Sequence, residues 1–166
     1  MSPGIRVVNT APLIFLSKIK KLELLRIGAE VVYAPATVLN ELKAVQDEAD
    51  MAVQEILGTW LLEKSCSQPN LLAMARQALD PGEAKVIALA LELGITDVVL
   101  DDLDARSFAC RSGLQPIGTL GLLLAAKRAE IIRTVFPEID ALGKAGFHAS
   151  AALLARILTE AGEQQA

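Results

Sequence analysis

Three aspartates that could bind a cation lie close together at the end of a predicted strand. Asp101, Asp102 and Asp104 follow directly after the apolar run Val98 to Leu100. One aspartate is expected there as a helix N-cap, and a carboxylate in the first turn also suits the helix dipole. Three exceed what a cap needs, and packed acids repel one another unless a cation neutralises them. A metal site and a capped helix both remain open interpretations of this run.

Two glutamates on predicted helices extend the set of candidate ligands. Glu83 is in register with Ile87 and Ala90, so it lies along a buried stripe. It also completes a capping box with Asp80, which is an equally good structural explanation. Glu41 lies at the border of an apolar helix face, where a solvated glutamate is the commoner outcome.

Asn9 is the fourth candidate, because it ends the first predicted strand. Taken alone, an asparagine there is more simply a turn residue. Together, these segments supply hard oxygen ligands of the kind that Mg²⁺ and Mn²⁺ prefer. Such a site lowers the pKa of a metal-bound water and stabilises charge on a phosphate. The single histidine, His148, lies in a late turn, so no Ser/His/Asp or Cys/His arrangement competes with this interpretation.

The elements that must position these residues alternate between strands and helices. Apolar runs predict strands at 5–8, 30–34, 60–63, 97–100 and 115–117. Predicted helices cover 37–45, 48–57, 70–79, 81–93, 119 onward, 131–145 and 150–160, with further helices after Asn9 and Asp102. The helix after Asn9 would be capped by Thr10, and its apolar spacing continues through Leu22 and Leu25.

This alternation predicts an α/β fold, a three-layer α/β/α sandwich around a parallel sheet of four or five strands. The 166 residues suit a single domain, with a frayed polar tail from about Gly162, over residues 162–166. Ligands of such folds bind outside the carboxyl ends of the strands, where the strand order reverses. We therefore expect Asn9, Glu41, Glu83 and Asp102 to meet in one pocket at that edge.

Composition limits the cellular setting and the way in which nucleic acid could bind. The formal net charge is −4, so any nucleic-acid contact must use a local basic patch. No apolar run approaches the roughly 20 residues of a membrane helix. No signal peptide is recognisable, and Cys66 and Cys110 have no partner motif. We expect a cytoplasmic protein.

Four short stretches resemble those of PIN domains in both order and spacing. They are Val7 to Ile14, the surroundings of Glu41, Gly82-Glu83-Ala84, and Leu100 to Asp104. With Gly118 to Gly121, the chain is also similar to a prokaryotic PIN-related family of toxin-like nucleases. The resemblance covers nearly the whole chain, to about Gly162.

The resemblance implies an Mg²⁺- or Mn²⁺-dependent endoribonuclease, often the toxin of a toxin–antitoxin pair. It implies RNA as substrate and a small antitoxin protein as partner. Glu41, Glu83 and Asp102 would be the catalytic acids. Asn9 and Asp104 would join them as metal ligands. Thr10, Asp101 and Thr119 would be supporting residues, the two threonines as positioners of water or phosphate.

One departure keeps a second function open. The first acidic position of PIN domains is usually aspartate, whereas this chain has Asn9. Asparagine offers an oxygen without a charge, so the site could be weakened and the chain could instead be an interaction domain. Apolar helices at 120–126 and 151–158 are consistent with a core or with a homodimer interface. A response-regulator receiver is disfavoured, because 115–119 contains no lysine.

Overall fold

Five parallel strands form one sheet at the centre of the computed structural model, which describes residues 4–163. The strands follow one another in the sheet as β3-β2-β1-β4-β5. This confirms the predicted parallel α/β architecture and settles the number of strands at five. The strands are β1 (Ile5–Val8), β2 (Val31–Ala34), β3 (Leu61–Glu63), β4 (Asp97–Val99) and β5 (Gln115–Ile117).

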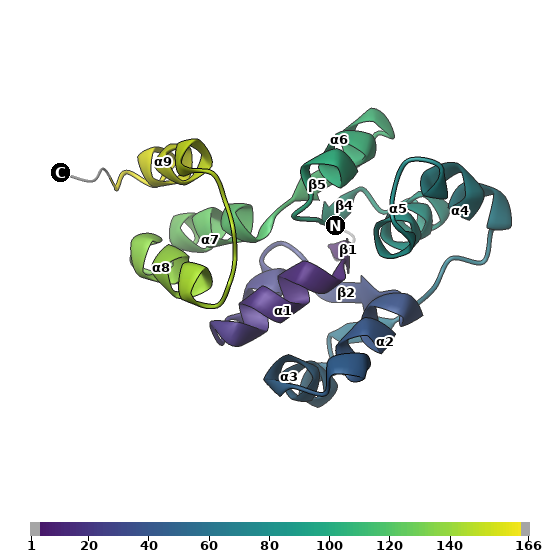
Figure 1. Ribbon diagram of the computed structural model, residues 1–166, viewed down its shortest axis with the longest axis horizontal. Coiled ribbons are helices and arrows are strands. Elements are labelled where there is room, and N and C mark those ends of the chain that lie inside the picture. The colour runs from purple at the N-terminus through teal and green to yellow at the C-terminus, as the bar shows by residue number, and fades with distance from the viewer. Residues whose placement is uncertain (1–3, 164–166) are drawn as a thin grey trace.

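Helices cover both faces of this sheet. Figure 1 shows α4, α5 and α6 on one side, with α1 and α7 on the other. Helix α1 packs against α3, and α4 packs against α5. The helices of the described residues are α1 (Thr10–Lys18), α2 (Ala36–Val45), α3 (Glu48–Ile56), α4 (Pro69–Arg76), α5 (Pro81–Leu93), α6 (Leu103–Arg111), α7 (Thr119–Arg128), α8 (Phe136–Lys144) and α9 (Ala151–Glu160). None of them is long and apolar enough to cross a membrane.

The two central strands are fully buried where they approach the carboxyl edge. Val7 and Val8 of β1 and Val98 and Val99 of β4 have no exposed surface. Apolar, β-branched side chains suit strands that are covered on both faces. Strands β1 and β4 pair in parallel, with Val8 opposite Val99. The backbone N–H of Asn9 then donates to the carbonyl of Val99 over 3.1 Å, so both strands end at one level.

The strand order reverses between β1 and β4. The chain runs outward from β1 through β2 to β3, then returns through α4 and α5 to β4 on the other side of β1. Connections that leave neighbouring parallel strands in opposite directions open a crevice at their carboxyl ends. The residues that follow β1 and β4 therefore lie at the switch point of the sheet.

Two helices differ from the sequence prediction. The first helix ends at Lys18, because Lys20 takes the left-handed conformation, with φ of 58°. Leu22 and Leu25 therefore belong to a separate 3₁₀ helix, Leu22–Arg26. The helix predicted for 131–145 begins only at Phe136, with a proline in its first turn.

The predicted frayed tail begins within the described residues. The carboxylate of Glu163 accepts hydrogen bonds from the Lys127 amine and the backbone N–H of Val135, each over 2.8 Å. These bonds join the end of the described chain to α7 and to the start of α8. Residues 164–166 of the predicted tail lie outside the described residues, as do residues 1–3 of the predicted domain.

Candidate metal centre

An open cavity of about 420 Å³ lies at the switch point of the sheet. It contains all four of the residues that the sequence predicted to meet there. Its walls also include an aspartate that sequence reasoning treated only as a cap, Asp80. The lining residues are Asn9, Thr10, Ala11, Ile14, Glu41, Asp80, Pro81, Gly82, Glu83, Asp101 and Asp102.

Asn9 has a side chain that its own helix does not use. It occupies the N-cap position of α1 with extended backbone, yet its side chain makes no capping hydrogen bond. Thr10 was the predicted cap, but it is the first helical residue instead. The carboxamide of Asn9 is therefore directed at the cavity rather than at the backbone of α1.

Gly82 forms the point on which oxygens from three segments converge. A Cβ atom placed on this buried glycine would lie 3.1 Å from Glu41 Oε1, 3.5 Å from Asp80 Oδ1 and 3.6 Å from Asn9 Oδ1. The absence of a side chain thus leaves a small space surrounded by three oxygen atoms. Two of these oxygens belong to carboxylates and one to an amide.

Glu41 is held in this position by the neighbouring helix. It projects from α2, where its side chain is exposed, and its Oε2 accepts a hydrogen bond of 2.8 Å from Thr10 Oγ1. This bond links the start of α1 to α2 across the cavity. Thr10 therefore positions Glu41, and its hydroxyl proton is used in this hydrogen bond.

Asp80 and Glu83 enter the cavity from the start of α5. Asp80 caps the helix, because its Oδ1 accepts the backbone N–H of Glu83 over 2.8 Å. The predicted capping interaction is therefore present on the Asp80 side. Burial raises the pKa of Glu83 to about 7, and the nearby charges of Asp80 and Asp102 act in the same direction. Glu83 consequently changes its charge near neutral pH.

Asp102 and Asp104 have different surroundings although both lie at the start of α6. Asp102 is the N-cap, and its Oδ1 accepts the backbone N–H of Ala105 over 2.9 Å. It is exposed and lines the cavity. Asp104 is exposed in the first turn and is absent from the cavity wall. The structure therefore brings Asp102 to the other acids and leaves Asp104 outside.

Asp101 is tied to the start of α7. Its two oxygens accept the backbone N–H and the hydroxyl of Thr119, each over 2.7 Å. Burial raises the pKa of Asp101, although these hydrogen bonds and the nearby Arg106 act in the opposite direction. Thr119 is fully buried, and its hydroxyl is used in the hydrogen bond to Asp101.

The cavity has the chemistry of a site for a hard divalent cation. Five carboxylates line it without any lysine, arginine or histidine in its wall. Within residues 4–163, no three His, Cys, Asp or Glu side chains lie close enough together to hold a metal ion in common. Mg²⁺ requires less than that, because it keeps several waters and binds through one or two carboxylates. The oxygens gathered around Gly82 meet this requirement.

Replacing Gly82 with alanine provides a test of this oxygen arrangement. The new methyl group would push Glu41 Oε1 away by a few tenths of an ångström, and we expect Mn²⁺ affinity to fall by about tenfold. The free energy of unfolding should stay equal or rise by about 0.5 kcal/mol, since alanine reduces the entropy of the unfolded chain. Calorimetric titration and thermal melting measure the two effects.

The matched control for this substitution is Gly143→Ala in α8. A Cβ atom there would have no neighbour within 4 Å. It should leave Mn²⁺ affinity unchanged. Equal Mn²⁺ affinity in the Gly82→Ala protein would contradict a role for the oxygens around that glycine.

Comparison with known families places the chain in one superfamily. A family model described as a PIN domain matches residues 5–163. The match thus spans every strand of the sheet and every residue of the acidic cavity. No curated protein matches the chain.

Proposed function

The chain belongs to the PIN domain family, and we propose that it is a metal-dependent endoribonuclease acting at the acidic cavity. PIN domains are generally nucleases that use divalent metal ions, with RNA as the general substrate. The observation that carries the proposal is the convergence of Asn9, Glu41 and Asp80 oxygens around Gly82. Glu83 and Asp102 complete the acidic wall.

We assign Asn9, Glu41, Glu83 and Asp102 as the residues that would hold Mg²⁺ or Mn²⁺. Their oxygens are the hard donors that these ions prefer. A bound ion would supply a water of lowered pKa and would stabilise charge on the phosphodiester. Asp104 is left out of this ligand set, because it does not line the cavity.

The remaining residues of the site act by positioning. Thr10 fixes the carboxylate of Glu41, and Thr119 fixes that of Asp101. Asp80 raises the pKa of Glu83 and orients the first turn of α5. With a pKa of about 7 in the metal-free site, Glu83 would release its proton when a metal binds.

Metal and pH dependence test the proposal. The purified chain should cut single-stranded RNA with Mn²⁺ or Mg²⁺, and EDTA should abolish the cleavage. Below the pKa of about 7, the metal must displace a proton from Glu83, so apparent Mn²⁺ affinity should rise up to about tenfold per pH unit and level off above it. Cleavage rates and calorimetry between about pH 6 and pH 8 measure this.

Glu83→Gln is the control, because it removes the titrating group. Its Mn²⁺ affinity should be weaker and almost flat over the same pH range. The stability of the metal-free wild type should depend on pH in the opposite direction. Folded Glu83 holds its proton more tightly than unfolded Glu83, so the free energy of unfolding should fall as pH rises from about 4.5 to about 7. Cleavage that persists in EDTA would contradict the proposal.

We also propose that the chain is the toxin of a toxin–antitoxin pair and binds a small antitoxin protein. This rests on the similarity to toxin-like PIN sequences. We also propose a homodimer, but without α7 as its interface. The leucines of that helix are buried within the protein: Leu120, Leu122, Leu123 and Leu124. A monomer mass in light scattering at micromolar concentration would contradict self-association.

Asn9 supports a second candidate function, a PIN-like interaction domain with weakened catalysis. The amide at this position supplies an oxygen to the cavity but no charge. Fewer anionic ligands mean lower affinity for Mg²⁺. The endoribonuclease and the interaction domain differ in the RNA cleavage expected when Asn9 is replaced with aspartate.

A further inference from the structure

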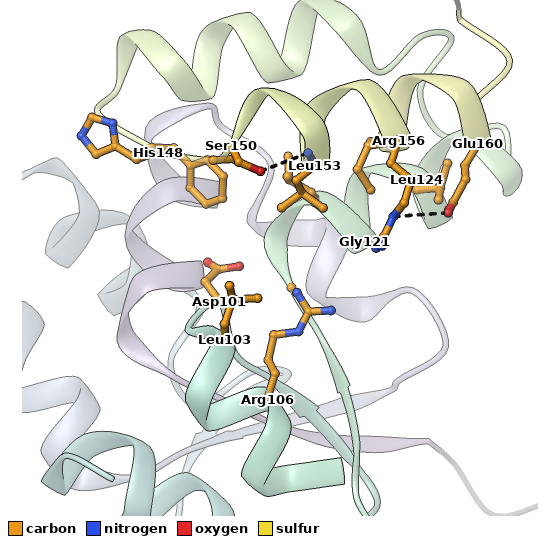
Figure 2. Close-up of a pocket in the computed structure, with 15 residues that line it drawn as sticks. Asp101, Leu103, Arg106, Gly121, Leu124, His148, Ser150, Leu153, Arg156 and Glu160 are labelled. Carbon is orange, nitrogen blue, oxygen red and sulfur yellow. Dashed lines mark hydrogen bonds and ion pairs between the residues drawn. The ribbon is translucent and has the colours of Figure 1, made fainter.

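A second cavity adjoins the acidic one and shares Asp101 with it. Its volume is about 330 Å³. Figure 2 shows Asp101, Leu103 and Arg106 on one side of this cavity, with Ser150, Leu153 and Arg156 of the C-terminal segment on the other. The two cavities therefore meet at Asp101, which follows β4.

The far wall of the second cavity has an apolar part beside the polar residues Ser150, Arg156 and Glu160. Leu120 and Leu124 of α7 and Leu153 and Ile157 of α9 line it. A volume of about 330 Å³ lies at the lower end of the range for small-molecule sites, which begins near 300 Å³. Sequence-specific contacts to RNA usually stack an unpaired base on aromatic side chains or arginine planes, and Phe147 and His148 also line this cavity. The cavity thus has the size and walls for one nucleobase.

Arg106 brings a positive charge to the boundary between the cavities. It is half-buried on α6, and its charge acts on the nearby carboxylate of Asp101. A Cβ atom on Gly118 would lie 3.1 Å from Arg106 Nη1 and 3.0 Å from Asp101 Oδ1. Gly118 has extended backbone, so it is required there for space rather than for its conformation. The space accommodates the guanidinium beside Asp101.

We infer that the second cavity is a subsite for the nucleotide next to the scissile bond. Its apolar wall takes one base of single-stranded RNA, and Arg106 binds the adjoining phosphate. An arginine guanidinium can donate two parallel hydrogen bonds to phosphate oxygens, which would fix the orientation of the RNA strand. This inference rests on the proposed nuclease function, since it places the scissile phosphate in the acidic cavity beyond Asp101.

Charge favours RNA over a protein segment at this surface. An acidic peptide would meet the unneutralised carboxylates of the first cavity. A basic peptide would meet Arg106 in the second, where Arg156 is already paired with Glu160. RNA is compatible with both cavities, because metal ions would neutralise the carboxylates of the first while Arg106 contacts phosphate in the second. The chain carries a net charge of −4, so such a local cation is required for RNA binding.

Arg106→Ala tests the subsite through steady-state cleavage of a short single-stranded RNA. We expect KM to rise by about tenfold and kcat to stay within about twofold, because a binding contact away from the reacting phosphate is lost. Arg128→Ala removes the same charge from an exposed position of α7 outside the cavity and should change neither constant. An unchanged KM, or a loss confined to kcat, would overturn the inference.

A second measurement needs neither a variant nor catalysis. Amide spectra of the wild type are recorded with uridine and adenosine 5′-monophosphates, with the nucleosides, with inorganic phosphate and with hexa-arginine. The nucleotides should shift Gly121, Ser150 and Leu153, more strongly than phosphate or nucleoside alone. Shifts from hexa-arginine only would overturn the inference in favour of a protein partner. Nucleotide shifts at this cavity without any RNA cleavage would support the subsite and reject the nuclease.

Discussion

Asp102→Asn is expected to lower RNA cleavage by at least about 100-fold while the fold stays intact. The substitution removes one anionic ligand from the cavity and keeps the shape of the side chain. Asparagine is as good an N-cap as aspartate, so the hydrogen bond from Ala105 to position 102 persists. Rates of cleavage with saturating Mn²⁺, compared with the thermal melting temperature, separate the two properties.

Asp104→Asn is the matched control for this experiment. It removes the same charge from the same turn of α6, but Asp104 does not line the cavity. It should retain cleavage to within about threefold. If both variants lost activity equally, the effect would come from the charge of α6 as a whole, and the assignment of Asp102 would fail.

Asn9→Asp is expected to tighten Mn²⁺ binding by about tenfold and to raise RNA cleavage. The change adds a charged oxygen where the amide now approaches the space around Gly82. Without metal, the added charge should lower the melting temperature, because it repels the carboxylates of Glu41 and Asp80. With Mn²⁺ present, the melting temperature should instead exceed that of the wild type.

Asn40→Asp adds the same charge on α2 without entering the cavity. It should change Mn²⁺ affinity by less than about twofold. Asn9→Ala removes the oxygen altogether and should weaken Mn²⁺ binding. Equal affinities in wild type and both Asn9 variants would show that this residue is no ligand. Tight metal binding by Asn9→Asp without RNA cleavage would favour the interaction domain.

The sheet and its acidic edge could be predicted because their signals are local. Short apolar runs such as Ile5–Val8 and Gln115–Ile117 mark the strands, and the structure has them with the same bounds. In a parallel sheet, residues that end neighbouring strands are close in space whatever their separation in sequence. Asn9 and Asp102 could therefore be placed together without knowledge of any side-chain contact.

Asp80 was missed as a cavity residue because a simpler explanation was already sufficient. An aspartate before Pro81 is a good helix cap, and it does cap α5. Its second role depends on Gly82, whose missing side chain brings Asp80 close to Glu41 and Asn9. Gly82 itself was the sequence signal for this role, because a glycine in the first turn of an otherwise strong helix suggests that space is needed there.

Other features depend on tertiary contacts that sequence patterns do not record. The left-handed backbone of Lys20 ends α1 early, although lysine has no preference for that conformation. The resemblance predicts Thr119 as a positioner of water or phosphate, and the burial of its side chain against Asp101 could not be predicted from the sequence. The second cavity joins Arg106 to Leu153 of α9, and no periodicity of either helix indicates that they meet.

Paramagnetic broadening by Mn²⁺ tests the central claim most directly, because it locates the metal rather than only detecting it. In amide spectra of the wild type at about pH 8, substoichiometric Mn²⁺ should first remove the signals of Asn9, Glu41, Gly82 and Asp102. The signal of Gly143, in α8, should persist to higher Mn²⁺ concentration. Broadening that is uniform over the surface, or that begins away from these four residues, would show that the acidic cavity is not a metal site.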